Sequence, residues 1–221
     1  MIILFDLDST LTDIEGFDEI ARQKGMYEPI AEITKRTMDG EIPFTEAFAT
    51  KLKMLAPTMD ELEWLVGEYK KHLVSGVKST LEILSQYPNT RIGLLSNNLE
   101  IAVKQFGRYL GLEDELCIGT KAFFDEFDNY LMLDTEDPLT RTGGKGEIIQ
   151  SIKQKYNDKI IFIGDSMADM VAGEKADLFI AYCGVVSRPR VVEESYLIAN
   201  NMEEVVETID KYLEIKSQEK S

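Results

Sequence analysis

Residues 2–12 of the chain read IILFDLDSTLT. The apolar run 2–5 predicts a short buried strand, and two carboxylates, Asp6 and Asp8, follow where that strand would end. Open α/β sheets bind ligands at the carboxyl ends of their strands, so we expect both side chains at a site on that edge. A solvated acidic turn is the alternative for an isolated Asp-x-Asp, because Asp and Ser are common turn residues.

Three later features favour a site over a turn. Ser96 follows the apolar run 92–95, and the pair Asp165 and Asp169 follows the apolar run 160–163. Lys145 stands in a Gly-Gly-Lys-Gly segment that opens a helical pattern. Alone, Ser96 is better explained as a capping hydroxyl and Lys145 as a solvated surface lysine. Together with the two acidic motifs, they predict one polar site.

The hydrophobic pattern divides the chain into two parts. Residues 13–76 have helical spacing throughout, with about four helices and no strand, whereas strands and helices alternate from residue 77 onwards. Such alternation predicts an α/β fold, a Rossmann-like parallel sheet with helices on both faces. We therefore expect a catalytic core of residues 1–12 and 77–221, and an all-helical cap of residues 13–76 inserted after the first strand. The aromatic residues of 116–133 suggest a hairpin off the sheet.

The composition limits the partners of the protein. A net charge of −16 over 221 residues argues against nucleic acid or an anionic membrane surface as partner, but it does not argue against a small-molecule phosphomonoester, because a local lysine and a metal can reverse the field inside a site. Cys117 and Cys183 lack metal-ligand spacing, and we see neither a secretory signal nor an apolar run long enough for a membrane span. The expected location is the cytoplasm, and the expected state is a monomer or homodimer.

The order of these motifs resembles the four-motif signature of the haloacid-dehalogenase-type phosphatases, over nearly the whole chain. Within that superfamily the chain is most similar to the phosphoserine phosphatases. The segments that carry this similarity are residues 6–11, 17–21, 38–40, 43–44 and 143–146. The resemblance implies Asp6 as a nucleophile that forms an aspartyl-phosphate, and Asp8 as general acid and then base. Asp8 would need a raised pKa to carry a proton at neutral pH.

The number of carboxylates calls for a cation. Hard oxygen ligands favour Mg²⁺, since the chain offers few His or Cys candidates. By resemblance, the Asp6 carboxylate, the Asp8 backbone carbonyl and Asp165 bind the metal, and Asp169 completes the metal site from the start of the next helix. Lys145 and Ser96 would hold the phosphoryl oxygens. His72, the only histidine, lies in a polar stretch, and we assign it no catalytic role.

The cap residues of this family would choose the substrate. Glu15, Met38 and Phe44 match the family pattern, with Glu15 suited to a substrate ammonium and the other two to excluding water. Lys51 stands where the family has Arg, on the same helix face as Phe44. Lys51 either binds a substrate carboxylate or is a snorkelling lysine at the edge of the helix core.

Other departures from the family pattern lie near the phosphate and cap motifs. Asn97 and Asn98 replace two glycines and could narrow the pocket or bind substrate, Asp39 replaces a small residue, and Ala168 replaces a hydrogen-bonding one. None of these changes removes the nucleophile, the acid, the lysine or the metal ligands.

These observations leave three hypotheses. The first is Mg²⁺-dependent hydrolysis of L-phosphoserine to L-serine and phosphate, in serine biosynthesis. The second is a related phosphatase for another small metabolite, such as a phosphoamino alcohol or phosphorylated homoserine. The third is a non-catalytic binding protein with this fold. A dehalogenase is disfavoured because a halide leaving group needs no proton, so the family's dehalogenases lack the second aspartate that this chain has as Asp8. A phospho-receiver domain is disfavoured because it would be about half as long as this chain.

Overall fold

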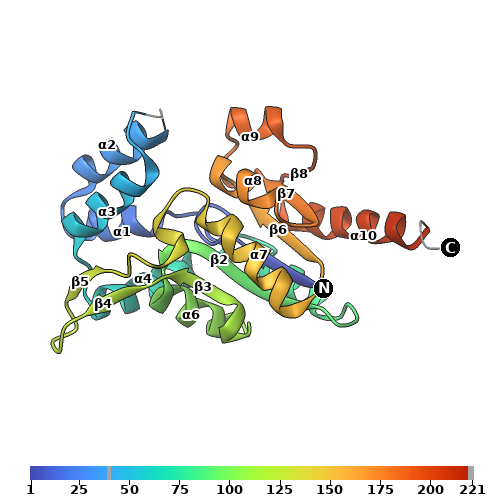
Figure 1. The fold of residues 1–221 in the computed structure, drawn as a ribbon, viewed down its shortest axis with the longest axis horizontal. Helices are drawn as coiled ribbons and strands as arrows, with labels where there is room; N and C mark the ends of the chain where they lie inside the picture. Colours follow the sequence, from blue (N-terminus) through green and yellow to red (C-terminus); the bar gives the residue numbers. More distant parts are fainter. Residues whose placement is uncertain (39–40, 219–221) are drawn as a thin grey trace.

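The computed structural model describes residues 1–38 and 41–218. Its main feature is a six-stranded parallel sheet in the order β3-β2-β1-β6-β7-β8 (Figure 1). The strands are β1 (Ile2–Phe5), β2 (Arg91–Leu99), β3 (Cys117–Thr120), β6 (Ile160–Gly164), β7 (Leu178–Tyr182) and β8 (Ile198–Ala199). The strand order changes direction between β1 and β6, and such a switch point forms a ligand-binding crevice at the carboxyl ends of the strands.

Helices cover both faces of the sheet, because each central strand is apolar on both sides. In β1, Ile3 and Phe5 pack in one hydrophobic cluster, and Ile2 and Leu4 pack in a second one. The first cluster includes α5 (Val77–Ser85), α6 (Glu100–Tyr109) and α10 (Met202–Gln218), and the second includes α7 (Gly144–Tyr156) and α8 (Met167–Gly173). The predicted α/β fold, a parallel sheet covered on both faces, is confirmed.

Between β1 and α5 the described residues form four helices, which we call the helical insert. They are α1 (Gly16–Gln23), α2 (Tyr27–Met38), α3 (Phe44–Leu55) and α4 (Met59–Lys71). Helix α4 begins with the capping box that the sequence indicates, in which Thr58 and Glu61 each accept a hydrogen bond from the other's backbone N–H. The chain enters and leaves the insert side by side, through an antiparallel bridge between Thr12 and Leu73. The division at residues 13 and 76 into core and cap stays a prediction.

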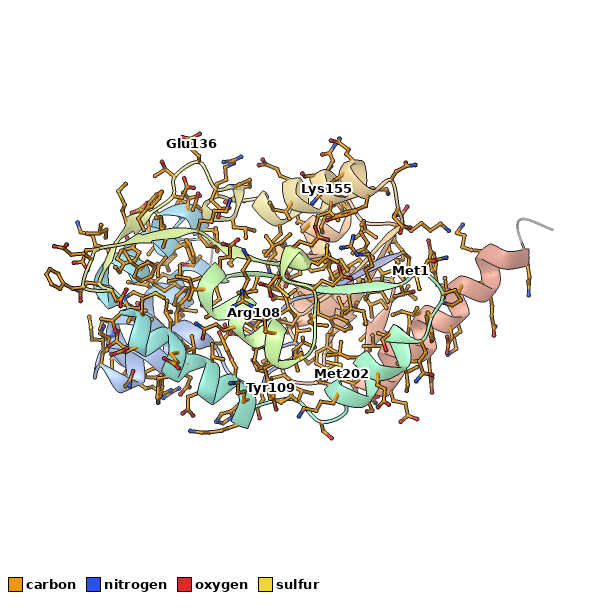
Figure 2. All side chains as sticks on the ribbon, turned by 90° about the horizontal axis from the view of Figure 1, so that it is seen from below. Met1, Arg108, Tyr109, Glu136, Lys155 and Met202 are labelled. Carbon is orange, nitrogen blue, oxygen red and sulfur yellow. The ribbon has the colours of Figure 1, made fainter. Side chains whose placement is uncertain are left out.

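The insert and α10 lie at opposite ends of the long axis of the molecule (Figures 1 and 2). Within the described ranges, no helix combines the length and the apolar character that a membrane crossing would need. The expected hairpin is present as β4 (Ala122–Phe124) and β5 (Tyr130–Leu133), which form a separate antiparallel sheet.

Several elements differ from the prediction. Strand β2 continues four residues past the predicted end at residue 95, and β3 belongs to the main sheet although it was expected in an irregular segment. The short elements β8 and α9 (Pro189–Glu194) were not predicted. Their apolar runs are too brief for a periodic pattern, so only pairing with neighbouring strands and packing define them.

Candidate active site

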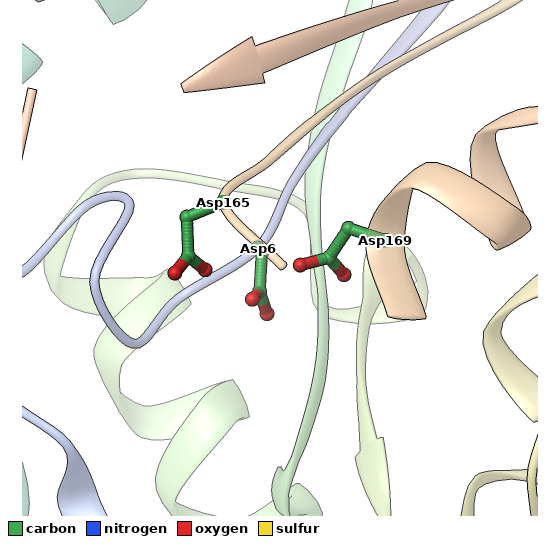
Figure 3. Close-up of side chains that lie close together, drawn as sticks. All are labelled: Asp6, Asp165 and Asp169. Carbon is green, nitrogen blue, oxygen red and sulfur yellow. The ribbon is translucent and has the colours of Figure 1, made fainter. Parts of the chain in front are cut away.

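Three carboxylates meet at the switch point of the sheet. Ligand oxygens of Asp6, Asp165 and Asp169 lie within 4.8 Å of one another, and Figure 3 shows the three side chains next to one another, with Asp6 between the other two. Register explains the meeting: Phe5 pairs with Ile163, so β1 and β6 end at the same level. All three aspartates are buried, which is unusual for carboxylates without a cation.

Asp169 is held firmly in this cluster. It lies in the first turn of α8 and forms a capping box with Ser166, whose backbone N–H donates to Asp169 Oδ2 at 3.0 Å. Gly164 makes this approach possible, because a Cβ at that position would lie 2.6 Å from Asp169 Cβ. The Gly-Asp-x-x-x-Asp motif thus contributes two of the three carboxylates of the cluster.

Lys145 supplies positive charge to the cluster from the first turn of α7. Its Nζ lies 2.8 Å from Asp6 Oδ1 and 2.7 Å from Asp169 Oδ1. Burial alone would lower the pKa of Lys145, but the two carboxylates raise it above the ordinary value, so the ammonium stays charged. Burial and the proximity of Asp169 raise the pKa of Asp6 well above its ordinary value.

Asp8 lies next to the cluster in a different environment. Burial, with a smaller effect of Glu15, raises the pKa of Asp8 to about 7, although hydrogen bonds from Tyr69, Gly16 and Asn98 oppose the shift. A carboxyl group with a pKa near 7 can be protonated or ionised at neutral pH, as a residue that acts first as acid and then as base requires. The hypothesis that Asp8 acts as general acid and then base requires a raised pKa of this kind, and the role itself stays a prediction.

The end of β2 carries the next predicted residues. Ser96 is buried, and its Oγ accepts a hydrogen bond from Asn98 N at 3.1 Å. Asn97 Nδ2 donates to the carbonyl of Leu139 at 2.8 Å, in the 3₁₀ turn η2 (Pro138–Thr140) that precedes α7. Asn98 instead donates to Asp8 Oδ2 at 3.3 Å. The structure thus shows separate partners for the two asparagines, and their contact with a substrate stays a prediction.

Arg188 was not predicted as a site residue. It precedes α9, and its Nε and Nη2 lie 2.9 and 2.8 Å from Asp165 Oδ2. Its Nη2 also lies 3.7 Å from Glu15 Oε1, so Arg188 connects the core to the start of the insert. Burial, with Asp169, raises the pKa of Asp165 to about 7 in spite of this guanidinium. The position of Arg188 a few residues after β7, at the same sheet edge as the aspartates, was the available signal.

A pocket of about 330 Å³ lies between the insert and the core edge. Its lining includes Ser9, Glu15, Asp18, Thr34 and Arg188. Ser9 Oγ donates to Glu15 Oε1 at 2.7 Å. The backbone of Ser9 has a positive φ of 53°, which places this residue in a tight loop. A larger hollow of about 470 Å³ lies away from the aspartates, at the start of β2 and the end of α6.

Lys51 faces this acidic side of the insert. Its Nζ donates to Thr34 Oγ1 at 3.4 Å, and among the described residues it forms no ion pair. Burial lowers the pKa of Lys51, while the negative charges of Asp18, Glu15 and Asp8 act in the opposite direction. The amine is therefore partly desolvated and under the influence of three carboxylates, and the choice between a substrate-binding and a snorkelling Lys51 stays a prediction.

The remaining insert residues are less informative. Phe44 is half-buried and stacks on Phe48, with ring centroids 5.5 Å apart. Met38 is the last residue of α2, and its side chain lies outside the described residues, as does Asp39. The water-excluding role proposed for Phe44 and Met38 stays a prediction.

A family model described as haloacid dehalogenase-like hydrolase matches residues 1–177. The chain belongs to the haloacid dehalogenase-like hydrolases. A phosphoserine phosphatase from Mus musculus is 32% identical over 194 residues, covering 87% of this chain and 86% of the relative. The structure of a phosphoserine phosphohydrolase-like protein from Francisella tularensis is 26% identical, with a TM-score of 0.83 over 94% of this hydrolase and 98% of that protein.

A further solved structure is described as a phospho-aspartyl intermediate analogue of phosphoserine phosphatase. It is 25% identical, with a TM-score of 0.76 over 94% of this chain and 97% of that one. The predictions of this superfamily and of a phosphoserine phosphatase-like enzyme are confirmed. The roles of the individual residues follow only as proposals.

Proposed function

We propose that this hydrolase is a Mg²⁺-dependent phosphomonoesterase that acts through an aspartyl-phosphate at Asp6, with L-phosphoserine as its main substrate. The observation that carries this proposal is the pairing of two unlike carboxylates. Asp6 is in contact with a charged lysine inside a buried acidic cluster, whereas Asp8, two residues on, has a pKa of about 7. These are the environments that a nucleophile and an acid–base group require.

In the first step, an Asp6 carboxylate oxygen attacks phosphorus while the bond from phosphorus to the leaving oxygen breaks. Asp8 gives its proton to that oxygen, so an alcohol departs and Asp8 becomes a carboxylate. In the second step, Asp8 takes a proton from a water molecule that attacks the phosphoryl group, which restores Asp6. Lys145 offers positive charge to the phosphoryl oxygens, and the Ser96 hydroxyl can donate to them, because its described contact uses it only as an acceptor.

The donor set fits a hard divalent cation. Three buried carboxylates within 4.8 Å offer oxygen ligands of the kind that Mg²⁺ prefers, and Asp8 can add its backbone carbonyl. Mg²⁺, when bound, offsets the negative charge that Asp6, Asp165, Asp169 and the phosphate bring together. Lys145 and Arg188 contribute two further positive charges, one on each side of the cluster.

The substrate assignment rests on two charged residues of the insert side, Glu15 and Lys51. Glu15 suits a substrate ammonium, since its carboxylate lines the pocket and its side chain is 47% exposed. Lys51 suits a substrate carboxylate, because it is partly desolvated. The relatives described as phosphoserine phosphatases support this choice. A place in serine biosynthesis and a cytoplasmic location are parts of the same proposal.

The second candidate is a phosphatase for a related ester without an accessible carboxylate, such as a phosphoamino alcohol. It is favoured by the lysine at position 51, because a lysine lacks the two-pronged geometry that arginine offers a carboxylate.

The decisive experiment is steady-state phosphate release with Mg²⁺ on L-phosphoserine, phosphoethanolamine, phosphohomoserine and an aryl phosphate, for the wild type and Lys51→Ala. We expect phosphoserine to lead in kcat/KM by about a hundredfold, or about 2.7 kcal/mol of transition-state binding. Lys51→Ala should raise the KM for phosphoserine about tenfold and leave that for phosphoethanolamine nearly unchanged. Level values across the esters, or equal losses in the variant, would favour the second candidate.

A further inference from the structure

The carboxylate of Asp8 is held by three hydrogen-bond donors from three separate segments. Tyr69 Oη donates to Asp8 Oδ1 at 2.7 Å, and the backbone N–H of Gly16 donates to the same oxygen at 2.9 Å. Asn98 Nδ2 donates to Oδ2 at 3.3 Å. These donors come from α4, from the start of α1 and from the end of β2.

The network has a defined direction. The backbone N–H of Leu99 donates to Asn98 Oδ1 at 2.8 Å, so the amide nitrogen of Asn98 must face the other way. That nitrogen donates to Tyr69 Oη at 2.6 Å, and the hydroxyl of Tyr69 then has its single proton available for Asp8. A chain of hydrogen bonds thus runs from the backbone of β2 through Asn98 and Tyr69 to Asp8.

Burial makes this network rigid. Tyr69 is fully buried, Asn98 is 1% exposed, and the Tyr69 ring packs against Phe106 with centroids 5.4 Å apart. Gly16 completes the arrangement, because a Cβ there would lie 2.0 Å from Tyr69 Oη and 2.4 Å from Asn98 Nδ2. Any side chain at position 16 would therefore displace one of the two groups that hold Asp8.

We propose that Tyr69 and Asn98 are positioning residues that fix Asp8 for proton transfer to the leaving oxygen, an inference that rests on the proposed function. Two donors occupy Oδ1, whereas Oδ2 receives only the longer bond from Asn98, so Oδ2 is the oxygen that carries the transferable proton. As the bond from phosphorus breaks, its electron pair stays on the leaving oxygen, which takes the proton from Oδ2. The resulting carboxylate is the form to which all three donors bind.

A positioning role and a purely structural role predict different results when the leaving group is changed. If Tyr69 and Asn98 position Asp8, the loss of activity in their variants depends on whether the leaving group needs a proton. An alkoxide is a strong base and needs a proton as it leaves, whereas a nitrophenolate is a weak base and leaves without one. General acid catalysis supplies about 10²- to 10⁴-fold in rate, and a mispositioned acid loses part of that only where a proton is needed. The ratio kcat/KM isolates the first step, because it reports events up to the departure of the leaving group.

The test compares Tyr69→Phe with the wild type on phosphoserine, phosphoethanolamine and 4-nitrophenyl phosphate. We expect kcat/KM to fall about tenfold or more on both alkyl esters and less than about threefold on the aryl ester. The matched control is Tyr87→Phe, which removes a tyrosine–aspartate hydrogen bond to Asp210 far from the site and should change neither class. Asn98→Ala provides a second variant with the same expected selectivity, should the phenylalanine variant fold poorly.

Equal losses on alkyl and aryl esters, or no loss on either in folded variants, would overturn the positioning role. The double variant Tyr69→Phe, Asn98→Ala should lose little more than the more affected single variant, because both residues act on one carboxylate. A wild type that releases phosphate from none of the three esters would instead overturn the proposed function.

Discussion

The core side and the insert side of the candidate active site are built differently. On the core side, Lys145 contacts two buried aspartates at 2.7 and 2.8 Å, inside a cluster fixed by strand register and a helix cap. On the insert side, Glu15 lies 3.7 Å from Arg188 and has a side chain that is 47% exposed. The charged groups of the core side are thus buried and in close contact, whereas Glu15 on the insert side is half exposed and its ion pair with Arg188 is long.

From this difference we expect the core side to determine the rate of hydrolysis and the insert side to determine which ester is preferred. Buried ion pairs between groups that cannot relax fix the positions of the reacting atoms, so removing one of them changes the rate for every ester. Groups on the insert side are expected to contact the part of the substrate that differs between esters, so their removal changes which ester is preferred. Variants on the two sides should therefore differ in both the size and the substrate dependence of their effects.

The largest effect is expected for Asp6→Asn. An amide oxygen is a far weaker nucleophile than a carboxylate, so phosphate release should fall by at least about 10³-fold on every ester. The fold should persist, because asparagine has nearly the same shape as aspartate and Lys145 keeps its contact with Asp169. Phosphate release and thermal unfolding together check both statements.

The matched control is Asp13→Asn, which removes an exposed carboxylate seven residues further along the chain, paired only with the exposed His72 among the described residues. It should retain nearly full activity. Residual activity in Asp6→Asn above about a tenth of the wild type would show that Asp6 is not the nucleophile, and the contrast between the two sides would fail.

The next effect concerns the stability of the metal-free core side. Asp8 and Asp165 each have a pKa of about 7 in the folded chain, against an ordinary value of 3.8. Between pH 3.8 and about 7 the folded chain keeps protons that the unfolded chain has lost. The contribution of these two groups to the free energy of unfolding is therefore full at low pH and decreases as the pH rises to about 7. The slope is about 1.4 kcal/mol per pH unit for each group.

Thermal unfolding in EDTA should therefore show a Tm that falls from pH 5 to pH 7 and then levels off. Surface carboxylates with a lowered pKa, such as Asp114, affect stability only below about pH 4 and do not interfere. Asp165→Asn should give a shallower slope, and Mg²⁺ at pH 8 should raise the Tm of the wild type by binding the folded state. A Tm that rises over this range in EDTA would contradict the raised pKa values.

The core side was largely predictable from the sequence, and the reason is topological. Asp6, Asp165 and Ser96 each follow an apolar run, and parallel strands bring their carboxyl ends to one edge. Even the capping box at Ser166 and Asp169 follows from adjacent residues. A short stretch of sequence next to a strand thus determines most of this side.

The remaining contacts depend on residues far apart in the sequence. Tyr69 reads as one member of an apolar helix stripe, and nothing in that stripe shows that its hydroxyl reaches Asp8, 61 residues earlier. Arg188 lies in a loop whose path depends on how α9 packs. Asn98 was predicted to narrow the pocket or bind substrate, and its hydrogen bond to Tyr69 appears only once β2 and α4 are placed together.

The smallest effect is expected for His72→Gln, at the boundary between the two sides. His72 Nδ1 lies 2.8 Å from Asp13 Oδ1, but the two side chains are 43% and 57% exposed, and such pairs contribute about 0–1 kcal/mol. The chain segments stay connected without the ring, because the backbone N–H of Asp13 donates to the carbonyl of His72 at 3.0 Å. We expect kcat/KM within about twofold of the wild type and unfolding free energy within about 0.5 kcal/mol. A tenfold loss of activity in a stably folded His72→Gln would mean that the exposed boundary takes part in the chemistry, because neither packing nor backbone pairing changes there.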